Sequence, residues 1–154
     1  MSRVVVNEIE AKVGNDITFN DTVKIDTLKG KTTAGSITVQ GEGTATTNLQ
    51  QGLAKGWCVF DGTGTIASAD SFNFSSLTDN ATGDYRVTMA NDMSSINYAV
   101  SGTQIGATSS YYNSFLCSRG VPKNASSYRF TVRHEDGGAN DMDVLNTIAH
   151  GDLA

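Results

Sequence analysis

The sequence predicts an all-β protein with an extended N-terminal β arm or shaft (residues 1–46), a short helical hinge (47–56) and a small antiparallel β-sandwich or barrel as the head domain (57–154). Short runs in which apolar and polar residues alternate recur along the chain, as in strands with one buried face. Clusters of Asn, Asp and Gly separate these runs, and such residues accept the backbone angles of tight turns. The composition, with 16 Gly and one Pro, is also typical of turn-rich β proteins.

The arm begins with an apolar stretch, and charged residues at alternate positions predict an exposed or edge strand over residues 1–13. A strand of this kind can pair with a neighbouring subunit. An ordinary first strand of the same domain explains the pattern equally well. The apolar members of this stretch are the candidate assembly residues Val4, Val5, Val6 and Ile9.

Residues 14–43 hold three further apolar alternations, at 17–19, 23–28 and 37–39. Each offers only two or three apolar side chains, too few to form a core of its own. Segments of this kind become stable when several copies stack around a shared axis. The arm therefore predicts an oligomer.

The hinge is the one segment that predicts a helix. Thr47 or Asn48 can cap its N-terminus, and Leu49 and Leu53 lie one helical turn apart. Gly56 can end it. We expect about two turns of helix, with the head beginning at Trp57.

The first half of the head reads as four short strands separated by turn signals. The run at 57–60 is apolar throughout, and the run at 71–75 alternates so that Phe72 and Phe74 share one face. Asp, Asn and Gly predict turns at 61–64 and 79–84. We expect the strands at 57–60, 71–75, 85–89 and 98–100.

The second half of the head predicts three more strands, of which the one at 128–134 alternates most regularly. Residues 102–113 are polar and Gly-containing, which predicts a loop, and residues 135–141 predict a turn. The remaining two strands are expected at 114–117 and 144–150.

Several segments resemble the distal region of tail-fibre-like virion structural proteins of tailed bacteriophages, especially marine and cyanobacterial ones. The resembling segments together hold 44 of the 154 residues and lie between residues 23 and 85. Its segments are VKIDTLKGKTTAGSITV (23–39), LQQGLAK (49–55), FDGTGTI (60–66), DSFN (70–73), SLTDN (76–80) and TGDY (82–85).

The resemblance implies a non-catalytic structural protein of the virion: a short tail fibre or fibre-like appendage that forms a homotrimer and contacts the host surface. Its partners would be copies of itself, other virion proteins, and a host-surface glycan or protein. Members of this family generally carry a longer N-terminal region that docks on the tail, whereas the resemblance here begins close to Met1. A second hypothesis is therefore a capsid decoration or cement protein that clamps the shell through its N-terminal arm. A small lectin-like module is a third.

Composition argues against several other partners. The formal charge is −5 and no basic cluster is present, so nucleic acid is not an expected partner. No run approaches the roughly 20 apolar residues of a membrane-spanning helix, and the N-terminus lacks the apolar region of a signal peptide. We expect no membrane insertion.

No motif predicts an enzyme, a cofactor or a metal site. The sequence lacks a Gly-x-Ser-x-Gly elbow, and the acidic segment 135–143 lacks the ligand spacing of an EF-hand. His134 and His150 would lie near each other if the last two strands formed a hairpin, but we expect structural or surface histidines. Cys58 and Cys117 lie in apolar settings and are expected to be buried free thiols, with a disulfide as the alternative.

The candidate contact residues lie in two predicted loops of the head. Loops on a rigid scaffold commonly carry binding residues, and tyrosine suits interfaces because it contributes area and a hydroxyl. Packing of the tyrosines within the trimer is the alternative. The candidates for receptor or partner contact are Tyr111, Tyr112, Asp136, Asn140 and Asp141.

Overall fold

The computed structural model describes residues 20, 22–30, 37–40, 44–105, 113–117, 123–134 and 137–154. These described residues are nearly all β, with 55% of them in strands and 4% in helix, which confirms the predicted all-β class. The elements are β1 (Thr38–Gln40), β2 (Thr46–Asn48), α1 (Leu49–Gly52), β3 (Ala54–Asp61), β4 (Ala67–Phe72), β5 (Phe74–Ala81), β6 (Asp84–Met89), β7 (Ala99–Ile105), β8 (Asn113–Cys117), β9 (Ser127–His134) and β10 (Val144–His150).

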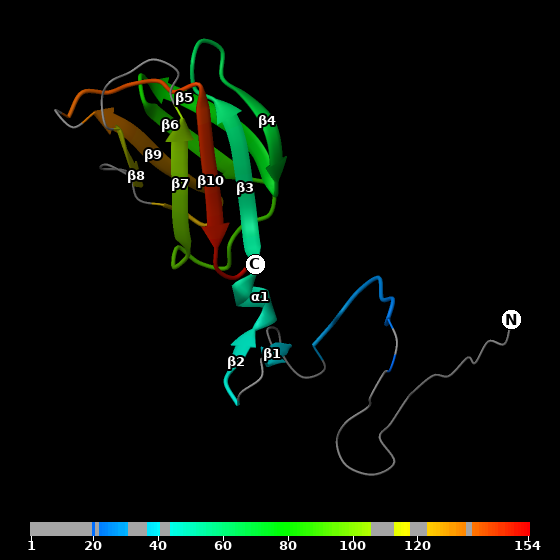
Figure 1. The fold of residues 1–154 in the computed structure, drawn as a ribbon. Coiled ribbons are helices and arrows are strands. Elements are labelled where there is room, and N and C mark those ends of the chain that lie inside the picture. The colour runs from blue at the N-terminus through cyan, green and yellow to red at the C-terminus, as the bar shows by residue number, and fades with distance from the viewer. Residues whose placement is uncertain are drawn as a thin grey trace, which may run out of the picture.

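The head is a sandwich of two four-stranded antiparallel sheets (Figure 1). The first sheet has the order β4-β3-β10-β7 and the second the order β5-β6-β9-β8. The first and last strands of the head, β3 and β10, pair at the centre of the first sheet, from Leu145↔Phe60 to His150↔Ala54. The first and last strands of the head therefore lie side by side and close the sandwich.

The core lies between the sheets and consists of the residues that alternate inward. Strands β6 and β10 show a period of two, with every second residue buried. Phe60 of the first sheet contacts Tyr85 and Phe130 of the second at ring-centroid distances of 5.5 and 5.9 Å. Tyr85 and Phe130 are 5.6 Å apart, so the three rings form one cluster that joins the two sheets.

The chain passes from the first sheet to the second at Asn73, between β4 and β5. Asn73 has a φ of 51°, a left-handed conformation that Asn tolerates better than most residues. Its side-chain nitrogen Nδ2 donates to the backbone carbonyl of Lys55 at 2.8 Å, and its Oδ1 accepts from the backbone N–H of Asn91 at 2.7 Å. These bonds hold the corner in place.

This corner makes the prediction of one strand over 71–75 wrong. Phe72 ends β4 and is 51% exposed on the first sheet, whereas Phe74 begins β5 and packs against the core. The two phenylalanines therefore do not share a strand face. The predicted turn at 79–84 is shorter than expected, because β5 continues to Ala81 and β6 begins at Asp84.

The other strands of the head match their predictions at 57–60, 85–89, 114–117, 128–134 and 144–150. The predicted loop at 102–113 is wrong in its first part, because β7 continues to Ile105. The last two strands do not form a hairpin. Strand β9 pairs with β6 and β8 in one sheet, and β10 pairs with β3 and β7 in the other.

The hinge contains the predicted helix, as the single turn α1. Asn48 caps it, since its Oδ1 accepts from the backbone N–H of Gln51 at 2.9 Å. The helix ends earlier than predicted, and β3 begins at Ala54 rather than Trp57. The buried Lys55 ammonium donates to the carbonyl of Leu53 at 2.9 Å and also to that of Gln50, so it satisfies carbonyls at the helix end.

The described part of the arm has little structure of its own. Strand β1 confirms the prediction at 37–39 and pairs with β2, from Thr38↔Asn48 to Gln40↔Thr46. The described residues 22–30 form no strand. The predicted strand at 1–13, with Val4, Val5, Val6 and Ile9, lies outside the described residues, as does the segment 17–19.

Replacing Phe130 by Ala tests the aromatic cluster. Phe130 is fully buried, so the substitution should lower the free energy of unfolding by about 3–5 kcal/mol, measured by urea denaturation. Phe72→Ala is the matched control: it removes the same side chain from an exposed site and should cost less than about 1 kcal/mol. Equal losses in the two variants would contradict the assignment of the core.

Candidate functional site

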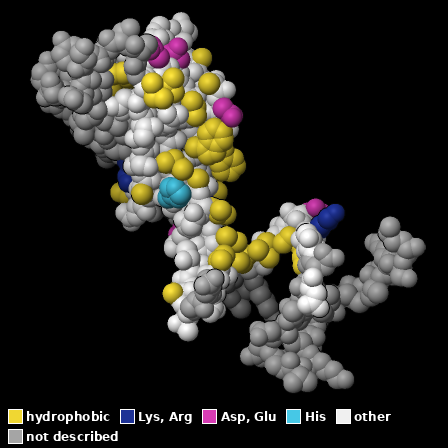
Figure 2. Space-filling view, viewed as in Figure 1, with side chains coloured by type: hydrophobic (Ala, Val, Ile, Leu, Met, Phe, Trp, Pro, Cys, Tyr) yellow, Lys and Arg dark blue, Asp and Glu magenta, His cyan; other side chains and the backbone are white. Residues whose placement is uncertain are grey.

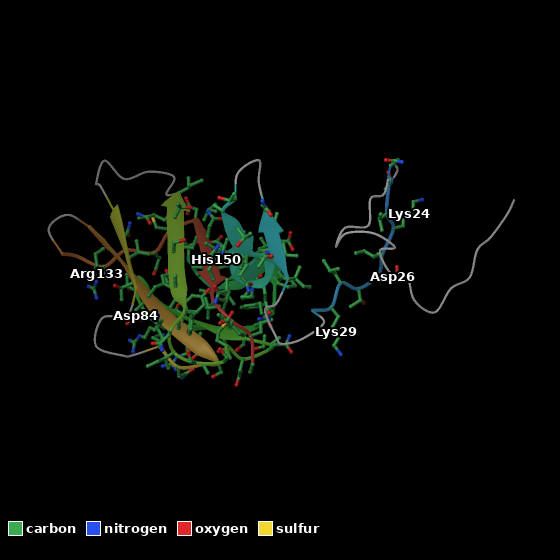
Figure 3. The ribbon with its side chains drawn as sticks, turned by 90° about the horizontal axis from the view of Figure 1, so that it is seen from below. Lys24, Asp26, Lys29, Asp84, Arg133 and His150 are labelled. Atoms are coloured by element: carbon green, nitrogen blue, oxygen red, sulfur yellow. The ribbon has the colours of Figure 1, made fainter. Side chains whose placement is uncertain are left out.

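The outer face of the second sheet is charged. Asp84 on β6 accepts two hydrogen bonds from the guanidinium of Arg129 on β9, one of them at 2.5 Å, and this hydrogen bonding raises the pKa of Arg129. Figure 3 shows Asp84 together with Arg133 on this side of the head. Paired charges of this kind are ordinary on a sheet that faces solvent.

The outer face of the first sheet is different, because it carries large apolar side chains. Residues opposite one another on paired strands share a face, so the register sets out rows across the four strands. One row runs Phe72, Trp57, Ile148, Ser101 from β4 to β7, and the next runs Asp70, Val59, Asn146, Thr103. Figure 2 shows hydrophobic side chains gathered on this face.

A hollow of about 350 Å³ lies on this face above β10. Trp57 and Val59 of β3 form one wall, and Ser101 and Thr103 of β7 form the other. Asn146 and Ile148 of β10 lie between the walls, and Asn146 Nδ2 donates to Thr103 Oγ1 at 3.2 Å. We call this hollow, with Trp57 as its aromatic wall, the Trp57 hollow.

The lining of the Trp57 hollow is uncharged. Its outward-facing side chains combine one indole, aliphatic carbon, two hydroxyls and one amide. Small-molecule sites typically pair an apolar surface with a few placed polar groups in this way, and volumes of about 300 Å³ are at the small end of their range. The Trp57 hollow is therefore the candidate functional site.

Asp141, a predicted contact residue, makes hydrogen bonds within the head. Its Oδ1 lies 2.5 Å from the hydroxyl of Tyr85 and accepts from the backbone N–H of Gly83 at 2.7 Å. The Tyr85 hydroxyl is also 2.9 Å from the carbonyl oxygen of Gly62. Burial, reinforced by the bond to Asp141, raises the pKa of Tyr85. Asp141 thus holds the end of the connection between β9 and β10 against two turns of the sandwich.

Gly83 explains why these turns can approach so closely. It has a φ of 61°, and a Cβ built on it would lie 2.6 Å from the carbonyl oxygen of Val132 and 2.7 Å from that of Asn140. Asn140, another predicted contact residue, lies half-buried in this crowded junction. A role for Asn140 and Asp141 in contacting a partner stays a prediction.

The remaining predicted contact residues, Tyr111, Tyr112 and Asp136, lie outside the described residues. Cys58 is buried and free, as predicted, and burial raises the pKa of its thiol. The side chain of Cys117 is not among those described.

The hairpin that would bring His134 and His150 together does not form, because β9 and β10 belong to different sheets. His150 instead lines a second, more polar hollow of about 300 Å³ near the hinge. Gln51 and Asp152 also line it, and Gln51 Nε2 donates to Asp152 Oδ2 at 3.4 Å. Across the described ranges, no three His, Cys, Asp or Glu residues are grouped in a way that could hold a metal ion.

The arm offers a second apolar surface. Five aliphatic side chains of the arm and hinge are between 50% and 59% exposed. Isolated exposed apolar residues are normal, but a series along one extended segment marks an interaction surface. We call this series the apolar arm: Val23, Ile25, Leu28, Val39 and Leu53.

The sequence analysis did not identify the Trp57 hollow. One available signal was the run Trp57-Cys58-Val59-Phe60, which is apolar at every position and therefore apolar on both strand faces. Cys58 and Phe60 face the core, so Trp57 and Val59 must face outward. The partners Ser101, Thr103 and Asn146 had no sequence signal, because only the pairing of β10 with β3 and β7 brings them together.

Comparison with protein-family models, with curated proteins and with solved structures found no match. The resemblance to tail-fibre-like virion proteins therefore stays a prediction. In the described part of the chain, no helix has the length and hydropathy needed to cross a bilayer.

Tyr85→Phe tests the bond between Tyr85 and Asp141. The variant loses a buried hydrogen bond to a carboxylate, so near neutral pH it should be about 1.5–3 kcal/mol less stable than wild type. The raised pKa of Tyr85 means that the folded state keeps a proton that the unfolded state releases above about pH 10. Wild-type stability should therefore fall with pH there, and the difference between the two proteins should shrink by about 1.4 kcal/mol per pH unit.

Urea denaturation of both proteins between pH 7 and pH 11 measures this difference. Because the other tyrosines are present in both proteins, their ionisation affects both curves alike. Parallel curves across the alkaline range would contradict the assignment, since they would mean that Tyr85 ionises equally in the folded and unfolded states.

Proposed function

We propose that the chain is a non-catalytic structural protein of a bacteriophage virion, a short tail fibre or fibre-like appendage that forms a homotrimer. In this proposal the arm assembles the copies and the sandwich head faces outward, where it contacts the host surface. The segments that resemble tail-fibre-like proteins support the virion assignment. The function is passive, since it consists of binding and assembly.

The observation that carries the proposal is the contrast between the head and the apolar arm. The head has a closed core in which thirteen hydrophobic residues are buried. The residues of the apolar arm are at least half exposed and pack into no such core. Burying them against other copies would remove apolar surface from water, which is the main driving force of association.

Assembly would also strengthen host contact. Three heads on one shaft can bind a surface together, and linked sites convert weak single contacts into avidity. The predicted contact residues Tyr111, Tyr112 and Asp136 would be present once per head. An outward head with a rigid core suits this role because loops are positioned by the scaffold below them.

The same arm also fits the second hypothesis, a capsid decoration protein. An extended segment with exposed aliphatic side chains can lie in a groove of a shell or add to one of its sheets. In that case the apolar arm would bind capsid protein rather than other copies of the chain. The two hypotheses place the protein at different parts of the particle.

Electron microscopy of intact particles with gold-labelled antibody against the head distinguishes these locations. We expect label at the tail, because the proposed fibre projects from it. Label scattered over the capsid would support the decoration protein instead. Particles that carry no label at either place, while the antibody binds the isolated protein, would contradict both hypotheses.

Removing the apolar side chains of the arm tests assembly. We expect wild-type protein to sediment at about three times the 16.3 kDa chain mass, and the triple variant V23S/I25S/L28S to sediment as a monomer. Ile96→Ser is the matched control, since Ile96 is 56% exposed on the head and its loss should leave the trimer intact. A wild-type monomer would rule out the shared axis.

A further inference from the structure

We propose that the Trp57 hollow binds a neutral saccharide, with one sugar ring stacked on Trp57 and its hydroxyls bonded by Asn146 and Thr103. The inference deepens the host-contact part of the proposed function and rests on it, because it names the class of surface molecule and the site. It assigns recognition to the outer face of the first sheet, not to the predicted contact loops.

The walls of the hollow suit the two kinds of surface that a sugar presents. A pyranose ring has an apolar face of C–H groups, which packs well against an indole, and an edge of hydroxyl groups. Trp57 supplies the flat apolar wall, and Thr103 with Ser101 supplies hydroxyls across from it. The walls stand on β3 and β7 on either side of β10, and the hollow of about 350 Å³ above β10 leaves room for a ring between them.

Asn146 is placed to select hydroxyl groups. It lies on β10 between the walls, directly opposite Val59 on one side and Thr103 on the other. Its amide offers both a donor and an acceptor, and its bond to Thr103 Oγ1 orients the side chain. A purely apolar ligand would remove this amide and the neighbouring hydroxyls from water without replacing their hydrogen bonds, which is unfavourable.

The charges around the hollow favour a neutral ligand. None of its described lining residues is charged, so a phosphate, sulfate or carboxylate would have no cationic partner there. Asp70 lies beside Val59 in the same row, and its carboxylate would repel an anion. The chain also carries a formal charge of −5.

The backbone argues against a peptide as ligand. The hollow lies over β10, whose backbone is paired with β3 on one side and β7 on the other. An extended peptide gains most of its affinity from main-chain bonds to a free sheet edge, and a central strand offers none. Recognition at this site must therefore come from side chains.

Phe72 extends the aromatic surface beyond the hollow. It lies directly opposite Trp57 on the neighbouring strand β4 and is 51% exposed. Opposed side chains on paired strands are about 5 Å apart at Cβ, so the Phe72 side chain continues the apolar surface of Trp57 onto β4. An oligosaccharide running across the strands from β7 towards β4 would place one ring on Trp57 and the next on Phe72.

The test begins with a panel of immobilised saccharides, in which neutral mono- and trisaccharides are matched with counterparts that carry carboxylate or sulfate. Binding of the best neutral probe is then titrated by tryptophan fluorescence. Trp57 is the only tryptophan in the sequence, so a saturable change in emission reports on the hollow itself. We expect neutral probes to bind and their charged counterparts to bind at least about tenfold more weakly.

Four variants locate the site. Trp57→Ala should weaken binding at least about tenfold, measured by titration calorimetry because this variant lacks the fluorophore. Asn146→Ala should weaken binding about threefold to tenfold while keeping Trp57. Phe72→Ala should weaken binding of the trisaccharide about threefold and leave binding of the monosaccharide unchanged. Ile96→Ala, which removes an exposed apolar side chain elsewhere on the head, should change neither.

Several results would overturn the inference: no panel member binds, charged saccharides bind as well as neutral ones, or Asn146→Ala and Trp57→Ala bind like wild type. A change in Trp57 emission that follows protein concentration instead of saccharide would assign the face to a second copy of the chain. These results are independent of the particle labelling, so a failed saccharide site and a failed virion assignment can be told apart.

Discussion

The contact between Phe60, Tyr85 and Phe130 is the interaction on which the rest of the structure depends. It joins a central strand of the first sheet to the two central strands of the second, with ring centroids between 5.5 and 5.9 Å apart. The Tyr85 hydroxyl extends the same cluster to Gly62 and Asp141, so the turns above the core are held by it as well. Phe60, Tyr85 and Phe130 are the three largest fully buried side chains among the described residues, and a buried aromatic side chain removes about 150–250 Å² of surface from water.

Because the inward side chains close the core, the outward side chains are free to differ between the two sheets. The second sheet uses its outer face for a charged pair, Asp84 with Arg129. The first sheet places a half-buried Trp57 beside an exposed Phe72 on its outer face, although burying aromatic side chains in the core would remove more apolar surface from water. We propose the saccharide site on this surface because it departs from the usual polar outer face of a sandwich.

The arm follows a different constraint from the head. Its described residues pair only in β1 and β2, and the apolar arm remains exposed. The hinge connects the two regions through α1, whose carbonyls Lys55 satisfies from the first strand of the head. Our two proposals thus place assembly and recognition on separate surfaces, so that copies could associate through the arm while the Trp57 hollow stays accessible.

The sequence by itself determined the features that depend on neighbouring residues: the all-β class, the alternating strands at 85–89 and 128–134, and a helix capped by Thr47 or Asn48. These follow from side-chain period and local hydrogen bonding, which act over a few residues. Only the tertiary structure decided that the last two strands lie in opposite sheets, that Asn73 turns the chain between sheets, and that Trp57 meets Asn146 and Thr103. Strand pairing joins residues far apart in the sequence, and no local pattern distinguishes β3 from β9 as the neighbour of β10.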